Sequence, residues 1–303
     1  MLISKRISIS GVISGTWINF ILDTLTCVGT YLLFRLIPDF EWNIPALIPS
    51  ILGTALAFFI GFNNNQAYNR WWEARIIWGG LVNDSRTWAR QLLYFNDPMA
   101  GYEDEEKPLV KTMIFRHIAF LYALKEKLRK QPAGEYLKYI SEEDQEAIQG
   151  DSNQANAILN LQSRDLNTLY KQGKIDGFQL MELNKMLVNF CDGMGKSERI
   201  FSTVFPTTYN YYTRVFIWIF IICATLVTAS NIGPWSILAG TLIGYVFLTI
   251  HQIGQFLLNP FDDIPTGIPL NQITRTIEIN LMETLGEEEI PEPVMSVDGE
   301  YVM

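Results

Sequence analysis

The chain has 303 residues, of which 49% are apolar, and it carries a formal net charge of −9. This apolar content is ordinary for a soluble protein, so composition alone does not indicate a membrane protein. Eight of the acids follow Arg275 with no base among them, which leaves the rest of the chain near −1 and without the basic field that nucleic-acid binding requires.

The distribution of charge indicates a membrane protein where composition does not. Residues 42–69 and 215–261 contain no Asp, Glu, Lys or Arg, whereas residues 102–199 are as charged as a soluble helical protein. A membrane-spanning helix needs about 20 apolar residues. We therefore predict an all-α membrane protein with a cytosolic helical region at about 70–199. Its four transmembrane helices are predicted at residues 17–37, 45–66, 213–229 and 235–258.

The first span contains one acid, Asp23. A charge inside a span costs a few kcal/mol unless it faces protein or water. We favour a polar contact near the membrane interface over an ion site. The second helix, opened by Pro45 and Pro49, is apolar at first. It is expected to pass through an amide-rich turn at residues 63–66, to leave the membrane still helical and to continue into the block Arg70-Trp71-Trp72-Glu73-Ala74-Arg75.

Amphipathic helical patterns fill the charged middle of the chain, and Ser141 followed by three acids predicts a helix N-terminus. Gly240 and Gly244, four residues apart in the last span, indicate close helix packing. The expected loops at 38–44 and 230–234 contain no Lys or Arg, so both termini and the charged region are expected in the cytoplasm. Residues 262–285 are expected to form a loop and a further helix outside the membrane, and the acidic residues 286–303 are expected to be disordered or to lie on the protein surface.

No pattern in the sequence indicates an enzyme. There is no P-loop, no Gly-x-Ser-x-Gly motif and no Rossmann fingerprint. The three cysteines are far apart, and no His, Cys or acid cluster has the spacing of metal ligands. Only two histidines occur, His117 and His251, and each is interpreted as a satisfied structural residue. We expect no cofactor and no metal.

Conduction is the remaining function that the pattern favours. Thr54, Phe58 and Phe62 recur every four residues and so lie along one stripe of the second helix. Such a stripe is usually part of a core. Here it leads directly into amides, so several copies around an axis would form narrow apolar rings that open into a polar vestibule. A hydrophobic constriction of this kind can gate ion flow by dewetting.

Three anchors resemble the bestrophin family in its bacterial branch: Gly61-Phe62, Arg70-Trp71-Trp72-Glu73 and Asn259-Pro260-Phe261. The similarity covers residues 1–275, which would form the channel domain, with 276–303 as the tail. It implies a homopentamer in the bacterial inner membrane with a central pore. The stripe at residues 54, 58 and 62 would be the pore neck, with Thr54 replacing the usual aliphatic residue, and a second, cytosolic constriction would lie near Ile175.

The resemblance also raises the questions of calcium gating and ion selectivity. Animal members are calcium-activated through acids just after the Asn-Pro-Phe motif, but here only Asp262 and Asp263 follow it, and hard calcium sites need about six oxygen ligands. We therefore predict no calcium gating. Phenylalanine rings have a positive edge, which favours chloride or another small anion at the neck. A sodium-selective channel of the same fold is the alternative.

The Arg-Trp-Trp block has two interpretations, because Trp and Arg also collect at membrane interfaces as anchors. Asn65, Arg70, Glu73 and Arg75 are candidates for pore-mouth and subunit contacts. Beyond a channel, a membrane-anchored sensor or scaffold stays open as another class. It is disfavoured because the charged region lies between the second and third spans. A transporter is disfavoured because no internal repeat is found.

Overall fold

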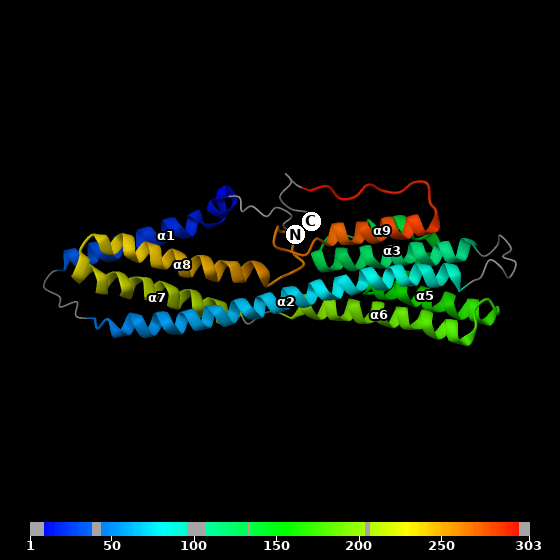
Figure 1. The fold of residues 1–303 in the computed structure, drawn as a ribbon, viewed down its shortest axis with the longest axis horizontal. Helices are drawn as coiled ribbons and strands as arrows, with labels where there is room; N and C mark the ends of the chain where they lie inside the picture. The colour runs from blue at the N-terminus through cyan, green and yellow to red at the C-terminus, as the bar shows by residue number, and fades with distance from the viewer. Residues whose placement is uncertain (1–8, 38–43, 96–106, 133, 204–206, 297–303) are drawn as a thin grey trace. The chain divides into compact units, whose positions relative to one another are not determined.

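The computed structural model describes residues 9–37, 44–95, 107–132, 134–203 and 207–296, and all regular structure in these ranges is helical (Figure 1). The chain divides into two compact units. The membrane unit consists of residues 4–71 and 204–259, and the polar unit of residues 72–203 and 260–303. Residues 38–43, which include most of the predicted acidic loop, lie outside the described ranges.

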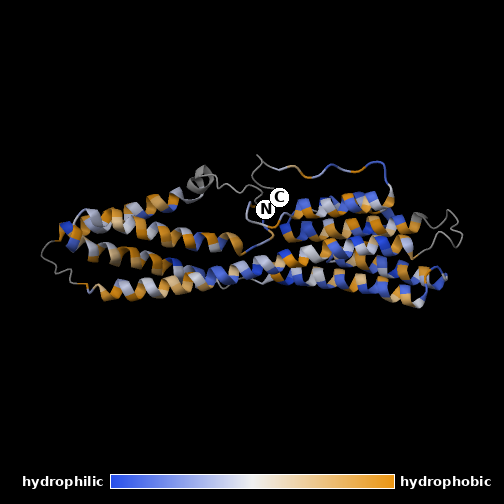
Figure 2. Cartoon of the chain, in the orientation of Figure 1, coloured by the Kyte–Doolittle hydropathy of each residue, from blue (hydrophilic) through white to orange (hydrophobic). Residues whose placement is uncertain are grey.

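The membrane unit contains α1 (Ile9–Leu36), the first half of α2 (Leu47–Tyr94), α7 (Thr207–Ile232) and α8 (Trp235–Leu257). All four helices are long and apolar enough to cross a membrane, in agreement with the predicted number of spans. Figure 2 shows their apolar character as orange ribbon. α7 begins at Thr207 instead of residue 213, because the polar residues at its start are helical as well.

α2 confirms the prediction that the second helix continues past the amides at residues 63–66 into the Arg-Trp-Trp block. The helix runs without interruption for 48 residues, from Leu47 to Tyr94, and its first half belongs to the membrane unit and its second half to the polar unit. Amide side chains do not end a helix when other elements satisfy their hydrogen bonds, and two of these amides bind neighbouring helices. The first half of α2 packs on α7, where a Cβ at Gly53 would lie 2.9 Å from the Phe220 ring.

The core of the membrane unit holds polar groups between apolar helices. Asp23 of α1 is completely buried and accepts a weak hydrogen bond from Cys27 Sγ at 3.7 Å. Gly240 and Gly244 of α8 lie directly against these side chains, because a Cβ at Gly240 would meet Cys27 Sγ at 2.9 Å and one at Gly244 would overlap the Asp23 carboxyl group. The predicted close approach at these glycines is therefore present, and Asp23 lies inside the unit instead of at its edge.

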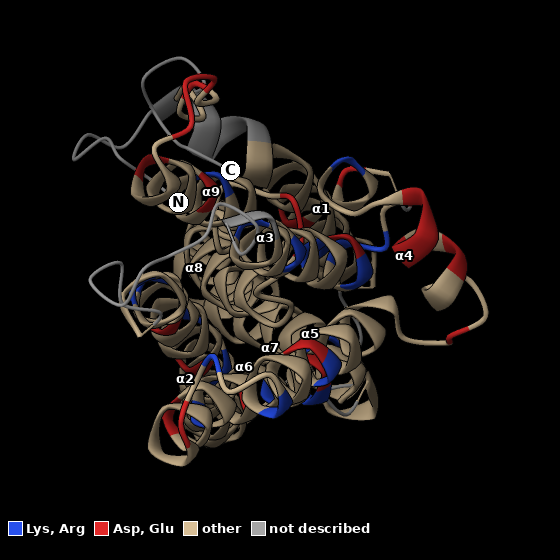
Figure 3. Cartoon of the chain, turned by 90° about the vertical axis from the view of Figure 1, so that its right-hand side faces the viewer, with Lys and Arg blue, Asp and Glu red and all other residues tan. Residues whose placement is uncertain are grey.

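The polar unit packs α3 (Lys107–Arg129) against α5 (Gln154–Lys171), α6 (Gly177–Ser202) and α9 (Leu270–Leu285). The short α4 (Glu142–Ile148) begins at the predicted position, with the Ser141 side chain accepting from the Asp144 amide; Figure 3 shows its acidic first turn in red. The buried Arg116 guanidinium binds Asp144 at 2.6 Å and also pairs with Asp165. This ion cluster ties α3 to α4 and α5.

The C-terminal segment contains the further helix that was predicted within residues 262–285, and this helix extends past residue 275, where the channel domain was expected to end. Residues 276–285 form the second half of α9, because Ile277 and Leu281 are fully buried. Gly286, with φ of +74°, ends the helix. Residues 286–296 then lie along the polar unit, where Glu287 pairs with Lys111 at 2.6 Å.

Candidate functional site

The predicted stripe on α2 is exposed in the single chain. Phe58 is 72% and Phe62 52% exposed, and Thr54 is exposed as well. The opposite face of the helix is buried against the membrane unit, with Leu56 and Ile60 no more than 2% exposed. The stripe is therefore not core of the subunit. It faces lipid, another subunit or a water-filled lumen.

Contacts with α7 fix the rotation of α2 and hence the direction of this stripe. The Tyr209 hydroxyl donates to the Phe59 carbonyl at 2.9 Å, and the two rings meet edge to face at 6.1 Å. Thr54 donates its hydroxyl hydrogen to the Ser50 carbonyl at 2.9 Å. What Thr54 presents outward is a methyl group and oxygen lone pairs.

The four amides that follow the stripe divide into two pairs. Asn63 is fully buried and its Nδ2 donates to Asn210 Oδ1 of α7 at 3.5 Å. Asn64 donates to the Ile250 carbonyl of α8 at 2.9 Å, and its side chain lies so close to Gly254 that a Cβ there would overlap it. Only Asn65 and Gln66 are exposed. The polar surface beyond the stripe is therefore smaller than the sequence suggested.

The Arg-Trp-Trp block continues α2 and is partly engaged within its own chain. The Glu73 carboxylate pairs with Arg199 of α6, and both side chains are about half exposed. An exposed pair of this kind contributes little to stability. Trp72 is 48% exposed, whereas Arg70 and Arg75 are half-buried. The pair with Arg199 gives Glu73 a partner within its own subunit.

The structure argues against Ile175 as a pore constriction. Ile175 is only 4% exposed, because its side chain packs inside the polar unit. A side chain that narrows a pore between subunits must be exposed in the single chain. Three residues further on, Phe178 is 82% exposed in the first turn of α6. The sequence did not single out Phe178, because apolar character alone does not distinguish an exposed aromatic residue from a buried one.

The loop after Asn259-Pro260-Phe261 is built on backbone contacts. Phe261 is fully buried, and the Ile268 amide donates to the Pro260 carbonyl at 2.7 Å. Asp263 pairs with Arg129 Nη1 at 2.8 Å. Burial raises the pKa of Asp262 above its ordinary range. Within the described ranges, no group of three or more His, Cys, Asp or Glu side chains is arranged to hold a metal ion.

Four apolar helices with an exposed aromatic line define a multi-pass membrane protein, and comparison with known proteins places it in a family. The sequence profile of the bacterial and fungal bestrophin proteins matches residues 3–283. The chain therefore belongs to the bestrophin family, as its motifs suggested, and it is an ion channel and not an enzyme.

Two curated relatives carry functional names. The voltage-dependent anion channel-forming protein YneE of Escherichia coli K12 is 30% identical over 247 residues, which cover 81% of this chain and 79% of YneE. The voltage-dependent anion channel-forming protein alr2987 of Nostoc is 27% identical over 274 residues, covering 88% of this chain and 87% of that protein. The crystal structure of a bacterial bestrophin homolog from Klebsiella pneumoniae superposes with a TM-score of 0.83 at 24% identity, over 90% of this chain and 99% of that one. The structural match supports the fold.

Proposed function

We propose that this chain forms a homopentameric anion channel of the inner membrane that conducts chloride, with its neck at Thr54, Phe58 and Phe62. The observation that carries the proposal is the exposure of these three side chains on a helix whose other face is anchored to its own subunit. Phe58 and Phe62 lie one helical turn apart and are both exposed. When several copies of α2 surround an axis, each of these positions would form a circle of phenyl groups around the pore. The names of the curated relatives support an anion as the permeant ion.

The chemistry of the neck favours anions over cations. No Asp or Glu lies between Trp42 and Asn69, so the neck carries no carboxylate ring that would attract cations. Phenyl edges carry partial positive charge, and an anion that passes between ring edges is stabilised by them. Beyond the neck, the exposed amides of Asn65 and Gln66 supply N–H donors.

For the second constriction we propose Phe178 in place of Ile175. The Asp176 side chain caps α6 by accepting from the Gln179 amide at 2.7 Å, and the Gln179 side chain accepts from the Asp176 amide at 2.9 Å. This capping box fixes the backbone of the first turn and so the position from which the exposed Phe178 side chain projects. An exposed aromatic residue on a fixed backbone suits a constriction that narrows a pore.

The orientation that fits this proposal places the polar unit and both termini in the cytoplasm. The turn between α7 and α8 contains no Lys or Arg, whereas the polar unit carries most of the basic residues. Cytoplasmic segments carry the excess of Lys and Arg in bacterial membrane proteins.

Current across a planar bilayer under a NaCl gradient tests the proposed activity. An anion channel gives a reversal potential near the chloride limit. A reversal potential near the sodium limit would show that the permeant ion is a cation, without contradicting the fold. The mass of the detergent-purified protein tests the assembly: five copies agree with the proposal, and a monomer or dimer contradicts it.

A further inference from the structure

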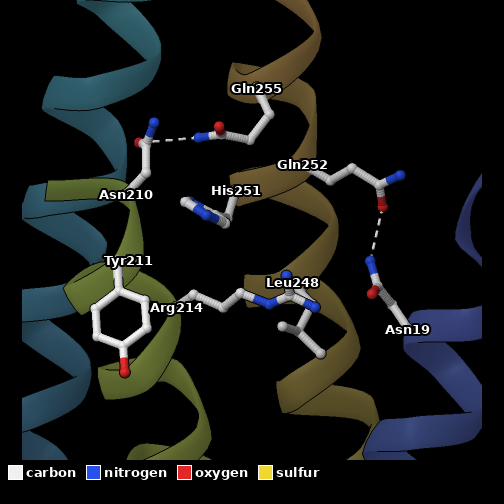
Figure 4. Close-up of a pocket in the computed structure, with 8 residues that line it drawn as sticks. All are labelled: Asn19, Asn210, Tyr211, Arg214, Leu248, His251, Gln252 and Gln255. Carbon is white, nitrogen blue, oxygen red and sulfur yellow. Dashed lines mark hydrogen bonds between the residues drawn. The ribbon is translucent and has the colours of Figure 1, made fainter. Parts of the chain in front are cut away.

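A polar pocket of about 410 Å³ lies inside the membrane unit, between α1, α7 and α8 (Figure 4). This volume is within the range of small-molecule sites. It lies where α7 begins and α8 ends, which is the end of the membrane unit where transmembrane helices meet lipid headgroups. The pocket has eight lining residues: Asn19, Asn210, Tyr211, Arg214, Leu248, His251, Gln252 and Gln255.

The only formal charge in the lining is positive. Arg214 is exposed in the first two turns of α7, and it makes no hydrogen bond or ion pair with any residue that the structure describes. Neither Asp nor Glu is among the lining residues. An exposed arginine near the end of a membrane-spanning helix lies at the level of the headgroups, so its guanidinium is available to an anionic group there.

The second observation is His251, which is only 7% exposed and has no partner for Nδ1 among the described residues. A buried polar atom without a partner costs about 1–3 kcal/mol. Figure 4 shows His251 reaching from α8 toward α7 and Arg214 reaching from α7 toward α8. The sequence suggested a satisfied structural histidine, whereas within the described residues one ring nitrogen of His251 is left without a partner.

Two of the four amides in the wall, Asn210 and Gln252, already use their oxygens as acceptors. Asn210 Oδ1 accepts from Gln255 Nε2 at 3.0 Å and from Asn63 Nδ2 at 3.5 Å, which leaves the Asn210 Nδ2 hydrogens for another acceptor. Gln252 Oε1 accepts from Asn19 Nδ2 at 2.7 Å. With the Arg214 guanidinium and the Tyr211 hydroxyl, the lining offers mostly donors. Such a lining fits a negatively charged group with several acceptor oxygens.

We infer that this pocket binds a phosphate group, with Arg214 as its charged partner and His251 and Asn210 as neutral donors. Two sources can supply that chemistry: the headgroup of an anionic phospholipid, or free inorganic phosphate. The amide oxygens of Asn19 and Gln255 remain as acceptors, and they suit the hydroxyls that a phosphatidylglycerol headgroup carries beside its phosphate. The inference concerns a site apart from the proposed pore neck and does not depend on ion selectivity.

Binding to the full-length protein in non-ionic detergent tests the inference. Short-chain phosphatidylglycerol, short-chain phosphatidylcholine and sodium phosphate are titrated separately at a fixed chloride concentration by calorimetry. We expect phosphatidylglycerol to bind wild-type protein about tenfold or more tightly than phosphatidylcholine. If sodium phosphate binds in a manner that depends on Arg214 and phosphatidylglycerol does not bind, the pocket is a phosphate site whose ligand is the free anion and not a lipid.

Three variants make the test specific. Arg214→Gln should weaken binding of the anionic ligand by about tenfold or more, since it removes the one charge. Arg90→Gln, the same change in the polar unit, should leave binding unchanged. Asn210→Asp keeps the oxygen that accepts from Gln255 and adds negative charge to the pocket, so it should also weaken binding. Absence of binding to wild-type protein, or equal binding by wild type and by a monodisperse Arg214→Gln or Asn210→Asp protein, would overturn the inference.

Discussion

The Asp23 carboxyl group of α1 lies directly against the Cα of Gly244 in α8, with no room for a side chain at position 244. Asp23 is completely buried, and Cys27 is its hydrogen-bond donor among the side chains of the described residues. The polar group is thus enclosed by helices, and the glycine is required because α8 must approach α1 closely at this level.

Gly244→Ala should lower the stability of the folded protein by about 1–3 kcal/mol, because the added methyl group overlaps the carboxylate and forces the helices apart. Gly29→Ala is the matched control, since a Cβ at residue 29 meets nothing within 4 Å. It should be neutral or stabilising, by up to about 1 kcal/mol. Thermal unfolding of both variants in detergent measures the difference. Equal melting temperatures would contradict the observed contact.

His117 should make the polar unit less stable in acid. It is completely buried, its Nε2 lies 2.8 Å from Ser85 Oγ, and burial lowers its pKa from 6.5 to about 3. The unfolded chain therefore takes up the proton first, and stability present above pH 6.5 is lost as the pH falls toward 3.

The non-titrating variant His117→Gln isolates this effect. Below pH 6.5 the wild type should lose up to about 1.4 kcal/mol per pH unit relative to this variant. Melting temperatures of the two proteins at neutral and mildly acidic pH provide the comparison. Parallel pH profiles would show that the histidine titrates normally.

Calcium should leave the current unchanged. Only two acids, Asp262 and Asp263, directly follow the Asn-Pro-Phe motif. Asp263 already pairs with Arg129, whose side chain is 1% exposed, and is therefore not free to bind calcium. A calcium titration of the current in planar bilayers is the measurement. A response with a midpoint in the micromolar range would contradict the prediction.

Phe178→Ala should change the relative permeability of anions, because it would remove the aromatic ring from the proposed second constriction. Ile175→Ala should leave permeability unchanged and lower stability by about 2–5 kcal/mol, since it opens a cavity in the polar unit. Bi-ionic reversal potentials for pairs of anions, together with melting temperatures, separate the two effects. A permeability change in Ile175→Ala alone would restore the original position of the constriction.

The sequence was sufficient for the spans and for the stripe on α2. Charge-free runs of membrane length can be recognised without tertiary information, and a four-residue repeat places Thr54, Phe58 and Phe62 on one face whatever the helix packs against. The continuity of α2 past its amides was predicted as well, but the partners of Asn63 on α7 and of Asn64 on α8 could not be, because they depend on tertiary packing.

The pocket and the second constriction depend on distant residues in the same way. Arg214 and His251 are 37 positions apart, and only the packing of α7 on α8 turns both into one pocket. Ile175 and Phe178 are both apolar, and only the fold buries the first and exposes the second. A signal for the pocket was present at Arg214, the last charge before a run of 47 uncharged residues.

The current carried by alanine variants of α2 in planar bilayers tests the proposed pore neck most directly. Phe58→Ala and Phe62→Ala should each raise the current at equal protein density, because they widen and wet the narrowest apolar rings. Phe59→Ala, the same change on the side of the helix that meets Tyr209, should not raise it. If Phe58→Ala and Phe62→Ala carry the same current as wild type, or if Phe59→Ala raises it equally, the stripe at Thr54, Phe58 and Phe62 is not the neck.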